Sequence, residues 1–174
     1  MTDDDATPAP ANVSPGAEHL VEPEDALPPI TMAQLPPHLR EAAARAGWSE
    51  LMPVQARAIP YLRAGRDLMV QSRTGSGKTG AFVLPIIDII DRGSKACQAL
   101  ILVPTRELAQ QVAHEAELLG GAFGVNTAAV YGGVPYGGQI EAFRRGAHIV
   151  VGTPGRILDH LLKRTLSFDA VQIL

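Results

Sequence analysis

Ser72-Arg-Thr-Gly-Ser-Gly-Lys-Thr-Gly-Ala-Phe82 is the stretch on which the fold prediction depends. Residues 67–72 are mostly apolar and predict a short strand, and residues 78–91 predict a buried helix. A glycine-rich turn between a strand and a helix is a natural anion site, because backbone N–H groups converge there and the helix N-terminus adds partial positive charge. Lys78 can then reach the outer phosphates of a nucleotide, and the Thr79 hydroxyl can ligate Mg²⁺.

Two alternatives compete with this interpretation of the turn. The segment Gly75-Ser-Gly-Lys-Thr-Gly80 also fits the G-x-G-x-x-G pattern of dinucleotide-binding turns, but that pattern needs an acidic residue about 20 positions later, and Val103-Pro-Thr105 supplies none. The second alternative is an ordinary Gly/Ser turn without a ligand. Such a turn does not require Gly-Lys-Thr at a helix start, so the sequence favours phosphate binding. The strict phosphate-loop pattern has Gly where this chain has Ser72, so the match is to a variant of that loop.

Length and composition favour one intracellular domain. A chain of 174 residues can bury a real core. The single cysteine, Cys97, provides neither a disulfide framework nor a zinc set, which fits a reducing cytoplasm. The first residues lack the features of a signal peptide, and the apolar run 81–87 is too short to cross a bilayer, so we expect a cytoplasmic protein with no membrane partner. His114-Glu-Ala-Glu-Leu118 lacks the second histidine of a zinc-protease motif.

Charge and proline divide the chain into two parts. Residues 1–29 hold seven acids, six prolines and no Lys or Arg, which predicts a disordered acidic tail. Residues 30–174 hold the other 11 acids against 15 bases, a net charge of +4. A mildly basic body is compatible with a polyanion ligand, although the signal is weak.

Strands and helices alternate from residue 67 onward. Nearly continuous apolar strands are typical of a sheet covered on both faces, so we predict an α/β fold with a parallel sheet flanked by helices. Two more helices precede the sheet, one from Pro36-Pro37 to Gly47 and one over 54–63, which Pro60 is expected to kink. The predicted strands are 67–72, 98–103, 125–130, 147–151 and 170–174, and the later helices are 78–91, 106–119, 137–145 and 155–163.

Hydroxyls, glycines and arginines follow three of the predicted strands. Thr105 is a candidate N-cap with Arg106 in the first helical turn, although a cap beside a surface charge is the plainer interpretation. Tyr131-Gly-Gly133 follows the next strand, and Gly152-Thr-Pro-Gly-Arg156 follows the one after. Because ligands of parallel sheets bind at the carboxyl ends of strands, these groups together indicate a site for a phosphodiester backbone.

The order of these pieces resembles the first RecA-like domain of bacterial DEAD-box RNA helicases, from about residue 30 to the end. The resemblance rests on five segments in family order. They are Gly47-Trp48 with Pro53-Val-Gln55 (Q motif), 72–79 (motif I, where the family often has Ala or Ser for the first Gly), 104–111 (PTRELAQQ, motif Ia), Gly132-Gly133 (GG element) and Thr153-Pro-Gly-Arg156 (motif Ib).

The resemblance implies an ATP-dependent RNA helicase, with ATP and Mg²⁺ as its ligands and RNA as its partner. Gln55 would hydrogen-bond the adenine edge, and Thr79 would ligate the metal. The implied ATP-binding residues are Trp48, Gln55, Thr74, Gly75, Ser76, Gly77, Lys78 and Thr79. The implied RNA-binding residues, which would grip the backbone without reading sequence, are Thr105, Arg106, Gly132, Gly133, Thr153 and Arg156.

The chain departs from the family pattern at both ends of the matched region. Ile30 stands where the family usually has an aromatic residue 17 positions before the Q-motif glycine, and Leu51-Met52 replaces its usual Pro-Thr. The sequence stops at Leu174, before the Asp-Glu-Ala-Asp motif, so we expect an incomplete, loosely packed RecA-like domain without ATPase activity of its own. A non-catalytic nucleotide- or RNA-binding remnant of a degraded helicase gene is one alternative. An unrelated phosphate-loop ATPase is another, against which the Q motif and TPGR argue.

Overall fold

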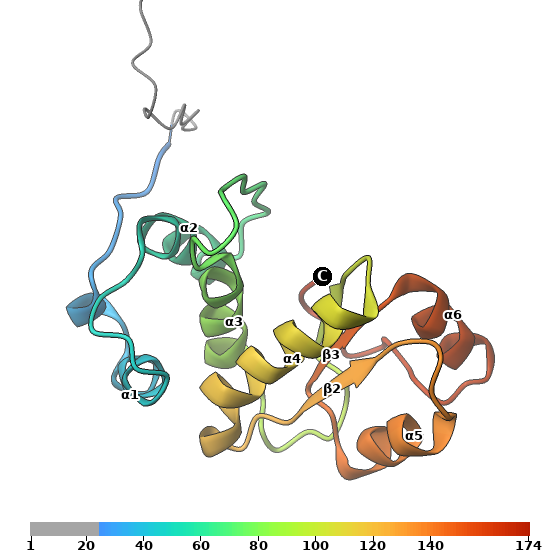
Figure 1. Ribbon diagram of the computed structural model, residues 1–174. Coiled ribbons are helices and arrows are strands. Elements are labelled where there is room, and N and C mark those ends of the chain that lie inside the picture. The colour runs from blue at the N-terminus through green and yellow to red at the C-terminus, as the bar shows by residue number, and fades with distance from the viewer. Residues whose placement is uncertain (1–24) are drawn as a thin grey trace, which may run out of the picture.

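The computed structural model describes residues 25–174 (Figure 1). The predicted tail, 1–29, therefore lies almost wholly outside the described residues, and 26–29 have no regular secondary structure. No helix in the described part of the chain is long and apolar enough to cross a membrane.

The predicted helices are all present, each within about two residues of its expected bounds. In chain order the elements are η1 (Met32–Gln34), α1 (Pro37–Arg45), α2 (Pro53–Arg63), α3 (Lys78–Ile89), β1 (Ala99–Leu102), α4 (Arg106–Gly120), η2 (Gly121–Phe123), β2 (Thr127–Val130), α5 (Tyr136–Arg145), β3 (Ile149–Gly152) and α6 (Pro154–Leu162).

Gly47 ends α1, as its position after a run of helix-forming residues predicts. Its φ of 82° lies in the left-handed region that glycine adopts without a Cβ penalty. The Gly47 N–H donates to Ala44 O and the Trp48 N–H to Ala43 O, both at 3.0 Å, so the last carbonyls of the helix find partners. This turn leads the chain directly to Trp48, which packs against the core formed around α3.

The sheet contains three parallel strands in the order β1-β3-β2. Its register pairs Leu102 with Gly152 on one side of β3 and Val130 with Gly152 on the other. The three strands therefore end level with one another. Residues that immediately follow these strands share one edge of the sheet.

Alternate residues of β3 face two separate apolar cores. Ile149 and Val151 are fully buried in the larger core, to which α1, α2, α3 and α4 contribute. Val150 points to the opposite face and packs in a smaller core with Ile157 of α6. In Figure 1, α4 lies along one side of the strands while α5 and α6 lie away from α1–α3. Both faces of the central strand are thus covered, as its continuous apolar sequence predicts.

Two of the predicted strands do not form, and these predictions were wrong. Residues 67–72 are a loop, and the side chain of Met69 is 98% exposed. Residues 170–174 contribute only one isolated bridge, between Ile173 and Ala99.

Backbone pairing, rather than composition, explains the difference. On the free edge of β1, Ile173 O accepts from the Leu100 N–H at 2.9 Å and the Gln172 N–H donates to Gln98 O at 2.8 Å. A β-strand needs a neighbouring strand to satisfy its N–H and C=O groups, and no strand among the described residues lies beside 67–72. An apolar run without such a neighbour remains a loop.

Candidate functional site

The turns after the three strands lie next to one another because the strands end level. Thr105 caps α4, since its Oγ1 accepts from the Leu108 N–H at 3.2 Å, as predicted. Thr153 occupies the N-cap position of α6 without a side-chain cap bond, and its N–H donates to Val130 O at 2.9 Å. Gly132, in the turn after the edge strand β2, is exposed. Two helix N-termini and one glycine loop therefore meet at this edge of the sheet.

The structure brings Arg106 and Gly133 together from different turns. Gly133 has a φ of +81°, and a Cβ built on it would lie 3.6 Å from Arg106 Nη1. The Arg106 side chain is 52% exposed, and its Nε donates to Glu107 Oε1 at 3.3 Å. The pKa of the exposed Glu107 carboxyl is lowered, first by a hydrogen bond from its own backbone N–H. An exposed cation thus lies beside an exposed glycine backbone.

Arg156 is placed differently from Arg106. Its side chain is only 8% exposed. Its Nη2 donates to Val134 O at 2.9 Å and its Nη1 to Gln139 Oε1 at 3.3 Å. The guanidinium carbon lies 4.2 Å from the centre of the Tyr136 ring. Arg156 therefore contacts mainly the protein itself.

Sequence reasoning missed Gln139 and His160, which form a buried polar network with Arg156. Gln139 Oε1 lies 2.8 Å from His160 Nε2, and His160 Nδ1 lies 2.8 Å from the Thr165 hydroxyl. His160 is fully buried. Burial lowers its pKa, and the positive charges of Arg156 and Lys163 add to that effect. The sequence offered one signal for this network. Gln139 lies four positions before Phe143, so the two residues share one face of α5.

The turn before α3 has the backbone shape expected of an anion site. Gly75 and Gly77 have φ of 77° and 86°, and α3 begins at Lys78. Lys78 Nζ donates to the carbonyls of Ser72 and Arg73, at 2.6 Å each. The ammonium thus lies within its own loop, where it is bound by acceptors that an anionic ligand could replace.

Two oxygens near this turn bear on whether a phosphate and a metal fit there. Ser76 Oγ is buried and has no hydrogen-bond partner among the described residues, which is consistent with room for a ligand oxygen. The Thr79 hydroxyl bonds the carboxyl of Glu115, whose pKa is raised by burial against the effect of that bond. The described residues contain no cluster of three acidic, His or Cys side chains for a metal, so the fit to Mg²⁺ rests on the Thr79 hydroxyl at the start of α3, a group that can ligate this metal together with nucleotide phosphates. Thr74 is exposed at the tip of the turn.

Gln55 joins α2 to this turn. It is 1% exposed; its Oε1 accepts from the Met52 N–H at 2.9 Å, and its Nε2 donates to Gly77 O at 3.1 Å. Trp48 lies against Gly80, where a Cβ would collide with the indole ring. This close packing explains the third glycine of the apparent dinucleotide pattern.

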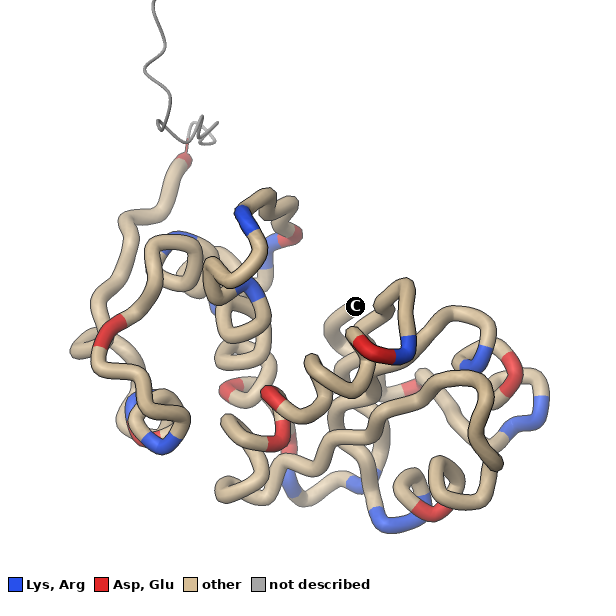
Figure 2. The backbone as a smooth tube through the Cα atoms, viewed as in Figure 1, with Lys and Arg blue, Asp and Glu red and all other residues tan. Residues whose placement is uncertain are grey.

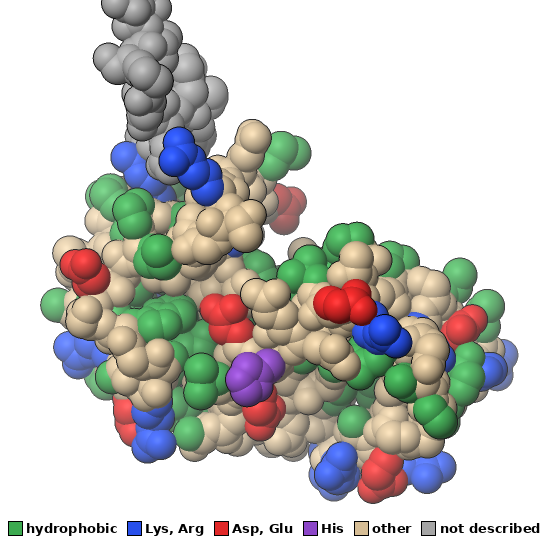
Figure 3. Space-filling model, in the orientation of Figure 1, with side chains coloured by type: hydrophobic (Ala, Val, Ile, Leu, Met, Phe, Trp, Pro, Cys, Tyr) green, Lys and Arg blue, Asp and Glu red, His purple; other side chains and the backbone are tan. Residues whose placement is uncertain are grey.

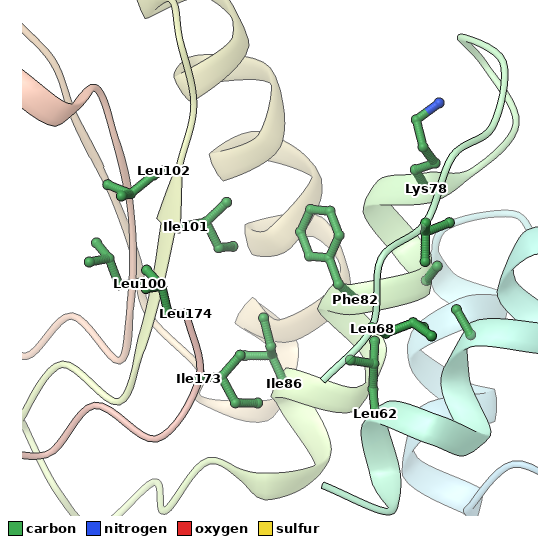
Figure 4. A pocket seen from close by; sticks show the side chains of 13 residues that line it. Leu62, Leu68, Lys78, Phe82, Ile86, Leu100, Ile101, Leu102, Ile173 and Leu174 are labelled. Carbon is green, nitrogen blue, oxygen red and sulfur yellow. The ribbon is translucent and has the colours of Figure 1, made fainter. Parts of the chain in front are cut away.

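An apolar cleft of about 450 Å³ separates α3 from β1. Figure 4 shows Phe82 and Ile86 of α3 on one wall, Ile101 of β1 on the other, and Lys78 at the end nearest the glycine turn. Leu68, from the loop predicted as a strand, also lines it. The cleft keeps the glycine turn apart from the paired strands.

Charge does not mark one surface as the ligand site. Figure 2 shows Lys and Arg distributed along α1, α2, the turns and the α5–α6 region, with acids among them. On the face seen in Figure 3, acidic and basic side chains are interspersed with apolar ones. On the face seen in this view, the described residues form no basic patch, and turn geometry is what defines the site.

Comparison with known proteins identifies the family. A family model described as DEAD/DEAH box helicase matches residues 52–174. Among curated proteins, the chain is 49% identical over 130 residues to the ATP-dependent RNA helicase CshA of Listeria monocytogenes, covering 75% of this chain and 25% of that protein. It is 50% identical over 130 residues to the ATP-dependent RNA helicase DeaD of Klebsiella pneumoniae, covering 74% and 20%. The chain thus spans a fifth to a quarter of these relatives' length.

Solved structures agree with this relationship. A DEAD box protein from Methanococcus jannaschii has a TM-score of 0.72 and 41% identity, over 79% of this chain and 38% of that one. A hypothetical ATP-dependent RNA helicase from Sulfolobus tokodaii has a TM-score of 0.70 and 35% identity, over 79% and 39%. The RecA-like α/β fold predicted from the sequence is confirmed. The chain belongs to the DEAD/DEAH box helicase family.

Proposed function

We propose that this chain is the part of an ATP-dependent RNA helicase that binds ATP and the RNA backbone. The observation that carries the proposal is the level ending of three parallel strands, which gathers two helix N-termini, an exposed arginine and a bare glycine loop at one edge. Such groups bind phosphates and sugars rather than base edges. ATP hydrolysis coupled to RNA unwinding is proposed with it, by analogy with the relatives' names.

For the nucleotide, we propose that Lys78 leaves the carbonyls of its own loop and contacts the β- and γ-phosphates. The N–H groups at the start of α3 would bind the same anion, and the Thr79 hydroxyl would hold Mg²⁺. When bound, Mg²⁺ neutralises charge on the phosphates. Trp48 and Gln55 lie behind the turn, and Gln55 is proposed to select adenine.

For RNA, we propose contacts from the turns at the strand ends. Arg106 is the exposed cation, and Thr105 and Thr153 stand at the N-termini of α4 and α6. Gly132 and Gly133 would allow the RNA backbone to approach the protein backbone closely. Because none of these groups reads a base, binding should tolerate any sequence and weaken with salt.

Titration of labelled ATP tests the nucleotide half. Lys78→Met keeps the length of the side chain but removes its charge, and should cost several kcal/mol of binding, about the value of a set of charged hydrogen bonds. Lys95→Met, in the loop after α3, is the matched control and should bind like the wild type. Equal affinities of the Lys78 and Lys95 variants would refute the assignment.

Binding of a labelled single-stranded RNA over a range of KCl concentrations tests the RNA half. Arg106→Ala should weaken binding by a similar factor for different sequences and reduce the salt slope by about one. Arg145→Ala removes an exposed arginine from the far end of α5 and serves as the control. A loss that depended on RNA sequence would contradict backbone recognition.

A further inference from the structure

We propose that Arg156 is a positioning residue, which acts with Gln139 to hold the loop 131–134 in place and does not itself contact RNA. The inference rests on RNA binding at the strand ends, which is the function proposed for this chain. It assigns different roles to Arg106 and Arg156, the two arginines in the strand-end turns, from their different surroundings.

Two hydrogen bonds bracket the glycines of this loop. Gln139 Nε2 donates to Tyr131 O at 3.0 Å, immediately before Gly132, and Arg156 Nη2 donates to Val134 O at 2.9 Å, immediately after Gly133. Glycines have wide conformational freedom, so a loop containing two of them needs outside contacts to hold one shape. These two bonds supply such contacts.

The donors and acceptors of Gln139 fit one arrangement only. Its Nε2 faces a carbonyl, which can only accept, and its Oε1 faces Arg156 Nη1, which can only donate. His160 Nε2 must then donate to the same Oε1, at 2.8 Å, while Nδ1 lies 2.8 Å from Thr165 Oγ1, whose hydroxyl donates to His160 O. Gln139 is 7% exposed. The network fixes the side chain that holds one end of the loop.

Arg156 is poorly accessible to a phosphate. Its two terminal nitrogens are bonded to Val134 O and Gln139 Oε1, one face of the guanidinium lies on Tyr136, and the side chain is 8% exposed. Its Nε lies 4.0 Å from Asp159 Oδ2. Contact with RNA would require the buried guanidinium to move out from between Tyr136 and its two bonded acceptors. Arg106 is over half exposed, so it can reach RNA without such a cost.

Two kinds of variant separate positioning from direct contact. Arg156→Lys keeps the charge but cannot form both bonds, and Gln139→Met keeps the size of the side chain but loses both polar groups. If Arg156 positions the loop, each should lower affinity for a single-stranded RNA about tenfold, the size of one lost charged hydrogen bond. The salt slope should stay near the wild-type value in both, whereas Arg106→Ala lowers it by about one.

The double variant adds a second criterion. Because both residues act through one loop, Arg156→Lys combined with Gln139→Met should lose less affinity than the two single losses added together. Near-wild-type affinity of Arg156→Lys, together with a salt slope reduced by about one in Arg156→Ala, would show direct phosphate contact and overturn the inference. Unchanged affinity in both single variants, each confirmed as folded by its thermal melt, would also overturn it.

Backbone order measured by NMR tests the loop without RNA. Order parameters of the Gly132 and Gly133 amides should be near those of rigid backbone in the wild type and fall toward about 0.6 in Arg156→Lys and Gln139→Met, with little change at Arg106. Unchanged order parameters in the two variants would overturn the inference, whatever their affinities for RNA. If the wild type binds no RNA, the proposed function fails, while these order parameters still decide whether the two residues hold the loop.

Discussion

The turns at the strand ends and the turn before α3 differ in what holds them. Turns 103–106, 131–134 and 152–156 each follow a strand that is paired with a neighbour, and loop 131–134 is also tied to α6. The turn 72–77 follows a loop and is separated from β1 by the apolar cleft. It is hydrogen-bonded to α2 through Gln55.

The contrast shows that a motif and its position in space are specified separately. Glycine at 75 and 77 and a helix start at Lys78 give the local phosphate-loop shape without help from the sheet. The place of that turn relative to the strand ends depends on the segment before it, which has no strand partner here among the described residues. Local sequence therefore sets the shape of the turn, and pairing sets where it lies.

Gly152→Ala tests the paired region and should have the largest effect. A Cβ at this position would lie 2.5 Å from Val130 O and 2.8 Å from Ile157 Cδ1, so the central strand and a neighbour must separate. We expect a loss of about 2–3 kcal/mol in the free energy of unfolding, typical of overpacking against backbone. Denaturant titration measures it. Gly155→Ala, where nothing lies within 4 Å, is the control and should change stability by less than about 1 kcal/mol.

Gly80→Ala is the matched test of the α2–α3 region. Its Cβ would collide with the Trp48 ring and come within 2.8 Å of Gln55 Nε2. Because side chains can shift more easily than backbone, we expect a smaller loss, about 1 kcal/mol, after the gain from alanine's helix preference. Gly137→Ala in α5 has open space around it and should be stabilising by up to about 1 kcal/mol. A Gly80→Ala chain more stable than wild type would show that Trp48 does not pack tightly there.

The fold was largely predictable because most of its signals are local. Capping residues, helix-forming runs and stop glycines set the helices, and the central strand was recognised by its apolar sequence at 147–151. The two failures, at 67–72 and 170–174, share a cause. Pairing partners lie far away in sequence, and composition does not report whether a partner is present.

The candidate site was predictable as a set of turns but not as a set of contacts. Thr105 was correctly placed as an N-cap, since capping depends on a few adjacent residues. The burial of Arg156 could not be predicted, because it depends on how α5 packs against α6. Gln139 and His160 gave only a weak signal for the same reason, as polar groups on helix faces without a visible partner.

Gln55→Ala asks whether the buried amide also selects the base. In the structure its two polar atoms contact Met52 and Gly77, so reading adenine requires it to use its remaining donor and acceptor capacity or to exchange these bonds. We expect the preference for ATP over GTP to fall by about tenfold, because a mismatched base leaves buried polar groups unpaired. Competition binding with the two nucleotides measures it. An equal loss of ATP and GTP binding would instead assign Gln55 a purely structural role.

The smallest effect we expect is a dependence of stability on pH through His160. Burial and the nearby Arg156 and Lys163 lower its pKa from the ordinary 6.5, so the folded chain keeps this imidazole neutral where the unfolded chain protonates it. Below pH 6.5 the unfolded state therefore binds more protons, and the free energy of unfolding falls as the pH is lowered toward the folded-state pKa. The contribution is fully present above pH 6.5. Asp159 opposes the shift, so the slope should be modest.

Denaturant titrations at several pH values between about 5 and 7.5, within the range where histidines titrate, measure this slope. His160→Gln removes the titrating group while leaving an amide that can donate to Gln139, and should flatten the dependence relative to wild type. His114→Gln replaces an exposed histidine of α4 by the same residue and is the matched control for the substitution itself. Gln139 Oε1 accepts hydrogen bonds both from the neutral imidazole of His160 and from Arg156. Protonation of His160 therefore also places a positive charge within the network that orders loop 131–134. Equal slopes for the wild type and His160→Gln would mean that this charge is accommodated at no cost, and that the network is less tightly packed than its distances indicate.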